Sequence, residues 1–371
     1  MSIPAARPIV SPEFSFRHTR LHGVNLGGWF SQVDDLYSKD PERNPGLHPH
    51  LRSFLGAADF AQIRQWGFNH VRLPVDYYNV FDRATLAPDE TALGLLATNL
   101  ALATEAGLGV ILDLHRCPGH DFFAGTLHEQ PFFSDPACRR DALRVWSVLA
   151  ERFGGNPLVA LEILNEPVAS TGAIWNAVKD EFCTHLRRLA PRSTIVVGSN
   201  RWNIPSEFAE LTPVDDDNIL YSFHCYAPLL FTHQHAPWMD YPPSRTTRHW
   251  PVDFGEDPGL PTRVHYEFGR WDSERLRSAF AAPLAFREKH GVPVACNEFG
   301  VYVQAPPADR LRYMGELIGI FREAGFGWSY WNYKNLDFGI LSLGEALHAS
   351  LPQYANPERL DRATLAILQA G

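Results

Sequence analysis

The stretch Val159-Ala-Leu-Glu-Ile-Leu-Asn-Glu-Pro167 decides the fold that we expect for this chain. It is short, apolar and closed by a proline, as is typical of a strand buried on both faces of a parallel sheet. A second stretch, Val292-Pro-Val-Ala-Cys-Asn-Glu-Phe-Gly300, has the same form. Each stretch ends in an Asn-Glu pair, which places Glu166 and Glu298 where a buried strand emerges. One such glutamate alone can cap a loop or pair with an arginine, but two in matching contexts favour paired acid/base and nucleophile chemistry on a glycosidic bond.

Eight strand-like runs alternate with amphipathic helical patterns along the chain. The runs are residues 21–26, 68–73, 109–115, 159–164, 194–198, 219–224, 292–296 and 327–331. The predicted helices are residues 57–66, 91–106, 136–153, 174–189, 273–290, 308–324 and 357–369, with a short candidate at 205–211. This alternation predicts an α/β fold, a (β/α)8 TIM barrel, as a single domain over residues 1–371 with the barrel from about residue 18 onward.

One segment, residues 227–271 after the sixth predicted strand, interrupts the regular spacing. It contains seven prolines and is rich in tryptophan, tyrosine and phenylalanine. So long a segment without regular structure is usually a functional loop or a lid, and a surface insertion that packs on itself is the alternative. We expect a long aromatic-rich loop here.

The composition is that of a globular protein and bears on the partners. Hydrophobic residues make up 45% of the chain and charged residues 20%, and the net charge of −9 with no basic block argues against nucleic acid as a partner. No uninterrupted apolar run is long enough to predict a membrane span.

The five cysteines are odd in number and lack metal-binding spacing, which favours reduced thiols. The first 14 residues do not resemble a signal peptide, so we expect a cytoplasmic protein, with secretion open if a leader has been trimmed. The sequence leaves the oligomeric state undetermined.

Polar or aromatic side chains also follow other predicted strands. Because the carboxyl ends of all barrel strands meet at one mouth, we expect these side chains to converge there with the two glutamates. They are Arg72, His115, Asn165, His224, Tyr226, Trp331 and Asn332.

Several motifs in this order resemble glycoside hydrolase family 5, the cellulase family. They are VRLP (71–74), LDLH (112–115), NEP (165–167), FHCY (223–226), NEFG (297–300) and YWNY (330–333). The opening HGVNLGGW (22–29) is similar to that of the exo-β-1,3-glucanase and β-glucosidase branch. The resemblance implies a retaining enzyme with Glu166 as acid/base and Glu298 as nucleophile. It also implies that Arg72, His115, Asn165, His224, Tyr226 and Trp331 are its remaining active-site residues.

These roles also agree with elementary chemistry. Arg72 would keep Glu298 anionic, a hydroxyl such as that of Tyr226 would orient it, and His224 would influence the proton of Glu166. Asn165 is suited to donate to the sugar 2-hydroxyl.

The remaining candidates concern the sugar-binding surface. We expect Trp331 to form the floor of the subsite for the attacked sugar and His115 to bind sugar hydroxyls. Trp29, Asn332 and Lys334 complete the expected supporting and substrate-binding set, with a solvated loop as the alternative for Lys334. No cofactor and no metal is expected.

The substrate that we expect is a β-glucoside or β-glucan oligosaccharide cut from its non-reducing end. Endo-acting β-glucanase, cellulase or β-mannanase activity by the same mechanism is the alternative. A metal-dependent barrel hydrolase is disfavoured, because His22, His115 and His224 come singly from different strands. A non-catalytic carbohydrate-binding barrel is disfavoured because both glutamates are present.

Overall fold

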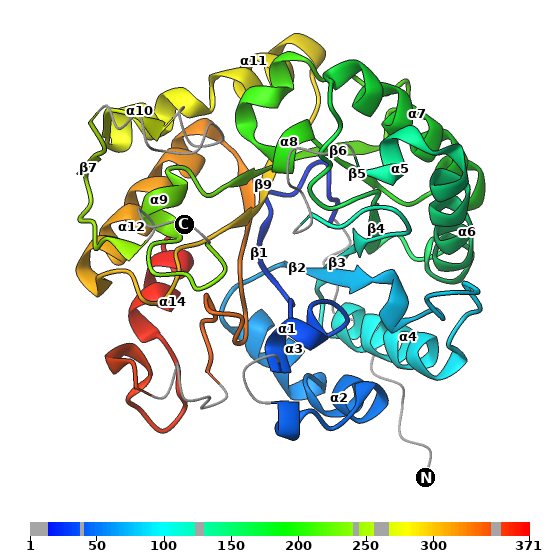
Figure 1. The fold of residues 1–371 in the computed structure, drawn as a ribbon, viewed down its shortest axis with the longest axis horizontal. Helices are drawn as coiled ribbons and strands as arrows, with labels where there is room; N and C mark the ends of the chain where they lie inside the picture. The colour runs from blue at the N-terminus through cyan, green and yellow to red at the C-terminus, as the bar shows by residue number, and fades with distance from the viewer. Residues whose placement is uncertain (1–13, 38–40, 123–129, 240–244, 256–266, 343–349) are drawn as a thin grey trace.

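A computed structural model of the chain shows a closed barrel of parallel strands surrounded by helices (Figure 1). It describes residues 14–37, 41–122, 130–239, 245–255, 267–342 and 350–371. The strands follow the order β1-β10-β9-β6-β5-β4-β3-β2 around the barrel. Their bounds are β1 His22–Asn25, β2 His70–Asp76, β3 Gly109–Arg116, β4 Val159–Glu162, β5 Ile195–Gly198, β6 Ile219–Cys225, β9 Val294–Phe299 and β10 Gly327–Tyr330. Every predicted barrel strand is confirmed, with ends that shift by a few residues.

Helices cover the outside of the barrel between successive strands (Figure 1). The main ones are α3 Ala57–Gln65, α4 Glu90–Glu105, α6 Pro136–Phe153, α7 Gly172–Leu189, α10 Ser273–Ala279, α11 Ala281–His290, α12 Pro307–Ala324 and α14 Arg362–Gln369. Shorter elements are α1 Val33–Tyr37, α2 Leu47–Ser53, α5 Pro131–Ser134, α8 Asn200–Asn203 and the 3-10 helix η3 Pro205–Ala209. In the segments that the structure describes, no helix is long and apolar enough to cross a membrane.

Two predicted helices differ from the structure. The single helix expected over 273–290 is divided into α10 and α11 at Phe280. Pro283 explains the division, because a proline lacks the N–H of the helical ladder and would clash with the carbonyl four residues earlier, so it is tolerated only in a first turn. The last helix begins at Arg362, where the side chain of Asp361 accepts a hydrogen bond from the backbone N–H of Thr364 and caps it.

The loop after β6 is more regular than expected. It contains the short helix α9 Leu229–Thr232 and a two-stranded antiparallel ladder between β7 Val252–Asp253 and β8 Arg270–Trp271. The expectation of a segment without regular structure is therefore wrong at these places. Residues 240–244 and 256–266 of this loop, with Tyr241 and Tyr266, lie outside the described residues.

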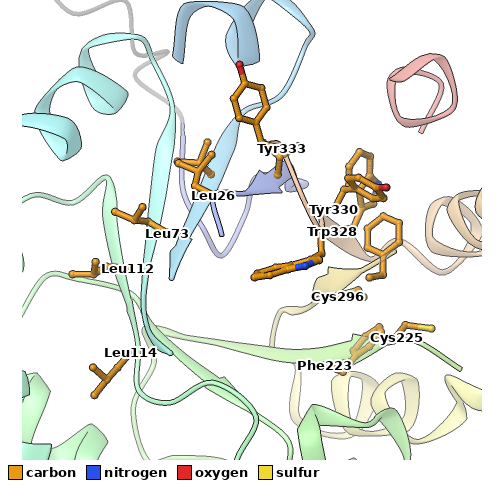
Figure 2. Packing of buried hydrophobic residues seen from close by; sticks show 14 of the residues in the cluster. Leu26, Leu73, Leu112, Leu114, Phe223, Cys225, Cys296, Trp328, Tyr330 and Tyr333 are labelled. Carbon is orange, nitrogen blue, oxygen red and sulfur yellow. The ribbon is translucent and has the colours of Figure 1, made fainter. Parts of the chain in front are cut away.

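The inside of the barrel is apolar at one end and polar at the other. A small cluster of Ile111, Ala160, Val196, Leu220 and Ala295 is covered by Phe16 and Leu21 and is separate from the main core. The main core lies between the outward faces of the strands and the helices, and Figure 2 shows part of it, including Leu73, Leu112 and Leu114. Since side chains alternate along a strand, the positions that follow the apolar cluster on the inner face are Asp113 on β3 and Glu162 on β4. The polar end of the barrel is therefore built from the same inner faces as the apolar end.

An irregularity in β9 shapes the polar end of the barrel. Phe223 of β6 pairs with Cys296, but the next residue, His224, pairs with Glu298, so β9 has one extra residue at this point. Such a bulge breaks the in–out alternation and re-aims side chains. As a result the neighbouring residues Asn297 and Glu298 both make contacts inside the barrel.

Candidate active site

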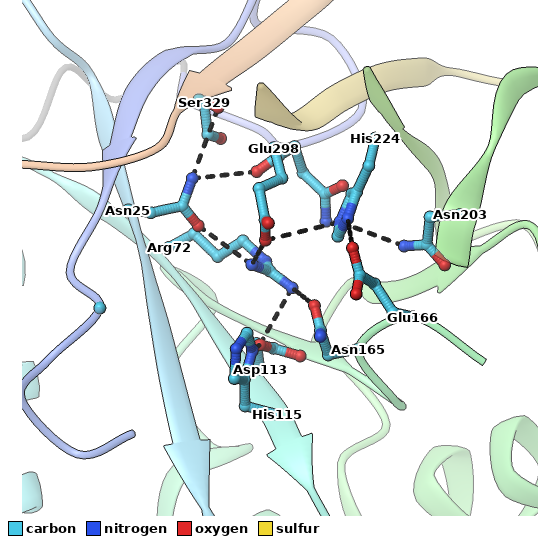
Figure 3. A network of polar contacts seen from close by, with 12 residues as sticks. Asn25, Arg72, Asp113, His115, Asn165, Glu166, Asn203, His224, Glu298 and Ser329 are labelled. Atoms are coloured by element: carbon cyan, nitrogen blue, oxygen red, sulfur yellow. Dashed lines mark hydrogen bonds and ion pairs between the residues drawn. The ribbon is translucent and has the colours of Figure 1, made fainter. Parts of the chain in front are cut away.

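Arg72, in the middle of β2, is the centre of a buried polar network (Figure 3). Its guanidinium is fully buried and donates to Glu162 at 2.7 Å and 3.0 Å and to Glu298 at 2.8 Å, and it lies 2.9 Å from Asp113. It also donates to the side-chain oxygens of Asn25 and Asn165. Every donor direction of the guanidinium plane is thereby used, which fixes the orientation of each partner.

The charge of this network is not balanced, since a single guanidinium faces three buried carboxylates. Burial raises the pKa of Asp113 and the pKa of Glu162 to about 7, although Arg72 lowers both. Removing charges from water is costly, so these acids hold protons more tightly than they would at the surface.

Glu298 has partners that favour its ionised form. One carboxylate oxygen accepts from Arg72 Nη1 at 2.8 Å and the other accepts from the hydroxyl of Tyr226 at 2.9 Å. Burial raises the pKa of Glu298, while Arg72 and then the Tyr226 hydroxyl lower it. The phenol itself remains a donor, because burial and the charge of Glu298 raise the pKa of Tyr226 well above its usual range.

Glu166 has a different environment. It follows β4 in a left-handed backbone conformation with φ of 45°, and its carboxylate Oε1 lies 2.9 Å from His224 Nδ1. A non-glycine residue with positive φ is strained, and such strain clusters at functional sites. Burial, followed by repulsion from Glu298, raises the pKa of Glu166 well above its usual range. Since Glu298 is bonded to a cation and Glu166 is not, Glu298 is the more readily ionised carboxyl of the two and Glu166 the more readily protonated one.

The separation of the two glutamates favours a retaining mechanism. One carboxylate oxygen of each and one ring nitrogen of His224 all lie within 4.8 Å of one another. Retaining glycosidases hold their two carboxyl groups roughly 5–5.5 Å apart, whereas inverting ones need roughly 6.5–9.5 Å to admit a water molecule.

The same three side chains are the group in the described part of the chain that is spaced to hold a metal ion. Their facing atoms are, however, already accounted for by the hydrogen bonds of Glu166 to His224 and of Glu298 to Arg72 and Tyr226. Hydrogen bonding explains the cluster without a metal.

Asn165 offers a hydrogen-bond donor to a ligand. Its side-chain oxygen accepts from Arg72 at 2.8 Å, which leaves Nδ2 facing away from the guanidinium. That nitrogen is buried and has no hydrogen-bond partner among the residues described. A buried amide without a partner is costly, so this atom is suited to bind a sugar hydroxyl.

Trp331 and His115 form a stacked aromatic pair at the polar end of the barrel. Their rings are stacked with centroids 5.8 Å apart and an interplanar angle of 4°. Asp113 holds His115 through Nδ1 at 2.7 Å. Gly27 makes room for the indole, since a Cβ at that position would lie 2.5 Å from Trp331 Cη2. A flat ring at this place suits the C–H face of a sugar.

Three expected substrate-binding residues have structural contacts instead. Trp29 is fully buried and donates from its indole nitrogen to the carbonyl of Leu51, so it offers no surface to a sugar. Asn332 is also fully buried, and it exchanges hydrogen bonds with both backbone groups of Gly27. The ammonium of Lys334 donates to Asp59 and to the carbonyl of Phe54. The expectation of direct sugar contact is corrected for these three, which join the ends of β1 and β10 to neighbouring elements.

Five residues of the site were not selected from the sequence. Asn25 joins Arg72 to backbone carbonyls of β9 and β10. Asp113, Glu162 and Asn297 complete the Arg72 network, and Asn203 contacts His224. Glu162 could have been identified from the sequence, because a charged residue within an apolar strand requires a partner. Asn203 could not have been, since it follows the weakest of the predicted strand–helix connections.

Comparison with known proteins identifies the family. The model of the family "Cellulase (glycosyl hydrolase family 5)" matches residues 47–337. Endoglucanase C of Acetivibrio thermocellus is 32% identical over 333 residues, covering 86% of this chain and 92% of that protein. Cellodextrinase A of Ruminococcus flavefaciens is 30% identical over 309 residues, covering 82% and 83%.

A more distant relative and a solved structure are also similar to this chain. A probable glucan 1,3-beta-glucosidase A of Aspergillus niger is 27% identical over 212 residues, half of each chain. Endoglucanase Cel5A of Thermotoga maritima has the same fold, with a TM-score of 0.70, 21% identity and coverage of 94% of this chain and 96% of that one. The chain belongs to glycosyl hydrolase family 5 and is a β-glycoside hydrolase of the retaining type.

Proposed function

We propose that the protein hydrolyses β-1,4-glucosidic bonds in gluco-oligosaccharides, with Glu298 as the nucleophile and Glu166 as the acid/base. The observation that carries the proposal is the contrast between two neighbouring glutamates. Glu298 is bonded to Arg72 and Tyr226 and is stabilised as an anion, whereas Glu166 is bonded to His224 and retains its proton. Environments that separate the pKa values of two carboxyl groups assign the nucleophile and the acid.

The reaction proceeds in two steps. Glu298 attacks the anomeric carbon while Glu166 donates its proton to the glycosidic oxygen, so that the glycosidic bond breaks and a glycosyl-enzyme ester forms. Glu166, now ionised, takes a proton from a water molecule whose oxygen attacks the same carbon and releases Glu298. Asn165 Nδ2 is placed to donate to the sugar during both steps, and such contacts strengthen as charge develops on the ring.

The choice of a β-1,4-glucan rests on the relatives. Relatives that are at least 30% identical over most of this chain include proteins named as endoglucanases and as a cellodextrinase. The opening motif, on which the expectation of exo-β-1,3 cleavage rested, makes structural contacts here. Asn25 binds Arg72 and backbone carbonyls, Gly27 makes room for Trp331, and Trp29 is in the core. Because these contacts support the site as a whole, we give the motif less weight than the relatives in choosing the linkage.

An aromatic cluster supports the binding of more than one sugar. Trp238, in the loop after β6, is the exposed large hydrophobic residue of the described chain, at 38%. Its ring lies 6.2 Å from that of His233, which lies 5.0 Å from the ring of Tyr226, the partner of Glu298. An exposed indole this close to the nucleophile is suited to a neighbouring sugar unit. We therefore favour internal cleavage of oligosaccharides over removal of terminal glucose.

Exo cleavage of β-1,3-glucan is the second candidate. It is favoured by the match to fungal 1,3-beta-glucosidases over about half of the chain.

The test is product analysis by chromatography on cellopentaose, laminaripentaose, mannopentaose and an aryl β-glucoside, with Glu298→Gln as the blank. We expect cellobiose and cellotriose from cellopentaose and no products from the variant. Glucose as the sole early product from laminaripentaose would replace the proposal with the exo-β-1,3 function. If mannopentaose alone gave products, the proposed substrate would be β-mannan instead of β-1,4-glucan.

A further inference from the structure

Asn203 is a buried residue beside the catalytic pair whose contacts are directed at His224. Its side-chain nitrogen lies 3.2 Å from His224 Nε2, and the other ring nitrogen, Nδ1, lies 2.9 Å from Glu166 Oε1 (Figure 3). Asn203 is fully buried and touches neither glutamate through a hydrogen bond in the described structure. The hydrogen-bonded route from the Asn203 side chain to the catalytic pair therefore runs through the imidazole.

The backbone at Asn203 has an unusual conformation. Three consecutive non-glycine residues of α8, Arg201, Trp202 and Asn203, have φ values of 47°, 60° and 56°. L-residues avoid this left-handed region, and runs of it are rarer than single cases. Strain of this kind persists only where the surroundings impose it, and it clusters at functional sites.

Contacts on both sides hold this left-handed turn, residues 200–203. The backbone N–H of Trp202 donates to the carbonyl of Pro167, and the side chain of Asn200 exchanges two hydrogen bonds with the backbone of Ala169. Both partners lie in the segment directly after Glu166. On the other side, a Cβ at Gly198 would lie 2.5 Å from the Asn203 amide, so only glycine at the end of β5 leaves room for it. The turn thus fixes Asn203 relative to both the Glu166 segment and β5.

The consequence is chemical, because a neutral imidazole carries a single proton. Burial, followed by the charge of Arg72, lowers the pKa of His224 well below its usual value, so the ring is neutral. The Asn203 amide donates to Nε2, which must then be the unprotonated nitrogen. The proton of the ring is therefore on Nδ1, which faces Glu166 Oε1.

This tautomer has two effects on the catalytic carboxyls. Since Nδ1–H donates to Oε1, the proton of Glu166 is held on its other oxygen, Oε2, which is the one left to meet the glycosidic oxygen. Nε2 lies 3.8 Å from Glu298 Oε2 and has no proton to give to the nucleophile. The charged and titratable groups around the ring are Glu166, Glu298, Arg72 and His115, and the amide of Asn297 also contacts it.

We propose that Asn203 is a positioning residue that sets the tautomer of His224, and thereby the oxygen of Glu166 that carries the catalytic proton. The proposal deepens the retaining mechanism proposed above and rests on it. It gives the left-handed turn a function in catalysis that is separate from the functions of the residues in the family motifs.

The first test is direct and needs no substrate. In protein labelled with 15N-histidine, the ring nitrogens of His224, assigned by their loss in His224→Gln, report the tautomer by chemical shift. We expect a protonated Nδ1 and an unprotonated Nε2 in the wild type. A protonated Nε2 would overturn the proposal whether or not any glucoside is hydrolysed, so its failure is separate from failure of the proposed function.

The second test uses Asn203→Asp, which is isosteric and replaces the donor by an acceptor. The carboxylate would draw the ring proton to Nε2, and Nδ1 would then accept the proton of Glu166 away from the leaving group. General acid catalysis contributes about 10²–10⁴-fold. We expect kcat/KM for phenyl β-cellobioside, whose leaving group needs a proton, to fall by about 10²-fold. For 2,4-dinitrophenyl β-cellobioside, whose leaving group needs none, we expect a much smaller fall.

Asn200→Asp is the matched control. It makes the same substitution in the same turn, but its side chain contacts the backbone of Ala169 and not His224. We expect it to change the two substrates by the same factor. An equal loss on both substrates in Asn203→Asp would show a merely structural role and would overturn the proposal, and the tautomer measurement decides the matter if that variant does not fold.

Discussion

Replacing Tyr226 with phenylalanine tests the electrostatic account of the nucleophile. The phenol donates a 2.9 Å hydrogen bond to Glu298, and this bond is one of the two contacts that lower the pKa of that carboxyl against the effect of burial. The substitution removes the hydroxyl and keeps the ring, so the packing against His233 and Phe338 is retained.

The magnitude follows from the type of bond lost. A hydrogen bond to a charged group contributes about 1.5–3 kcal/mol, and about 1.4 kcal/mol corresponds to one pKa unit. The pKa of Glu298 is thus expected to rise by about 1–2 units. Because Glu298 must be ionised to attack, activity is lost as the pH falls through its pKa, and the acidic limb of the kcat/KM profile moves to higher pH by the same amount.

The assay is kcat/KM against pH on an aryl β-cellobioside, with the stability of each variant checked over the same range. Tyr302→Phe is the control, because Tyr302 belongs to the same aromatic cluster and its hydroxyl makes no hydrogen bond to either glutamate in the described chain. An acidic limb that stays in place in Tyr226→Phe, or that moves equally in both variants, would refute the reasoning.

Other substitutions test the remaining assignments. Glu298→Gln removes the nucleophile and should lower kcat by about 10⁴-fold or more, whereas substantial residual turnover would sink its assignment. Glu166→Ala should slow substrates with poor leaving groups far more than dinitrophenyl glycosides, and azide should restore turnover of the latter; equal losses would contradict an acid/base role. Glu162→Gln can accept from only one of the two Arg72 nitrogens that Glu162 binds, and the buried donor left without a partner should destabilise the fold by about 1–3 kcal/mol in denaturant unfolding. Glu90→Gln, which breaks an exposed ion pair, should change stability little, and similar effects of the two would contradict the network. EDTA should leave activity unchanged, and a loss reversed by added metal would show that the glutamates hold an ion.

Much of the site follows from local patterns. Glu166 and Glu298 could be identified because each interrupts an apolar run at its end, and a buried carboxylate needs a reason to be there. Arg72, His224, Tyr226, Asn165 and Trp331 could be identified because each sits at or beside the end of a strand-like run, and all such ends meet at one mouth. The structure places the first four of these residues in contact with the glutamates or with one another, and it stacks Trp331 on His115.

The residues that the patterns misjudged look the same in sequence as those judged correctly. Trp29, Asn332 and Lys334 lie in motifs beside the site, yet their atoms contact Leu51, Gly27 and Asp59. Proximity in sequence to a strand end does not decide whether a side chain turns towards the cleft or towards a neighbouring loop.

The amino-acid sequence by itself determined the barrel and the two glutamates. A strand buried on both faces needs an apolar run, and such runs alternate with helical patterns along this chain. The two glutamates stand out because each ends one of these runs. The tertiary structure alone decided which groups surround the glutamates. Arg72 meets Glu162 and Glu298 across 90 and 226 residues of chain, and the bulge in β9 turns both Asn297 and Glu298 inward. Asn203 reaches His224 only because a left-handed turn passes over Gly198. Barrel closure, strand register and backbone conformation set these contacts, and the local pattern of residues predicts none of these three features.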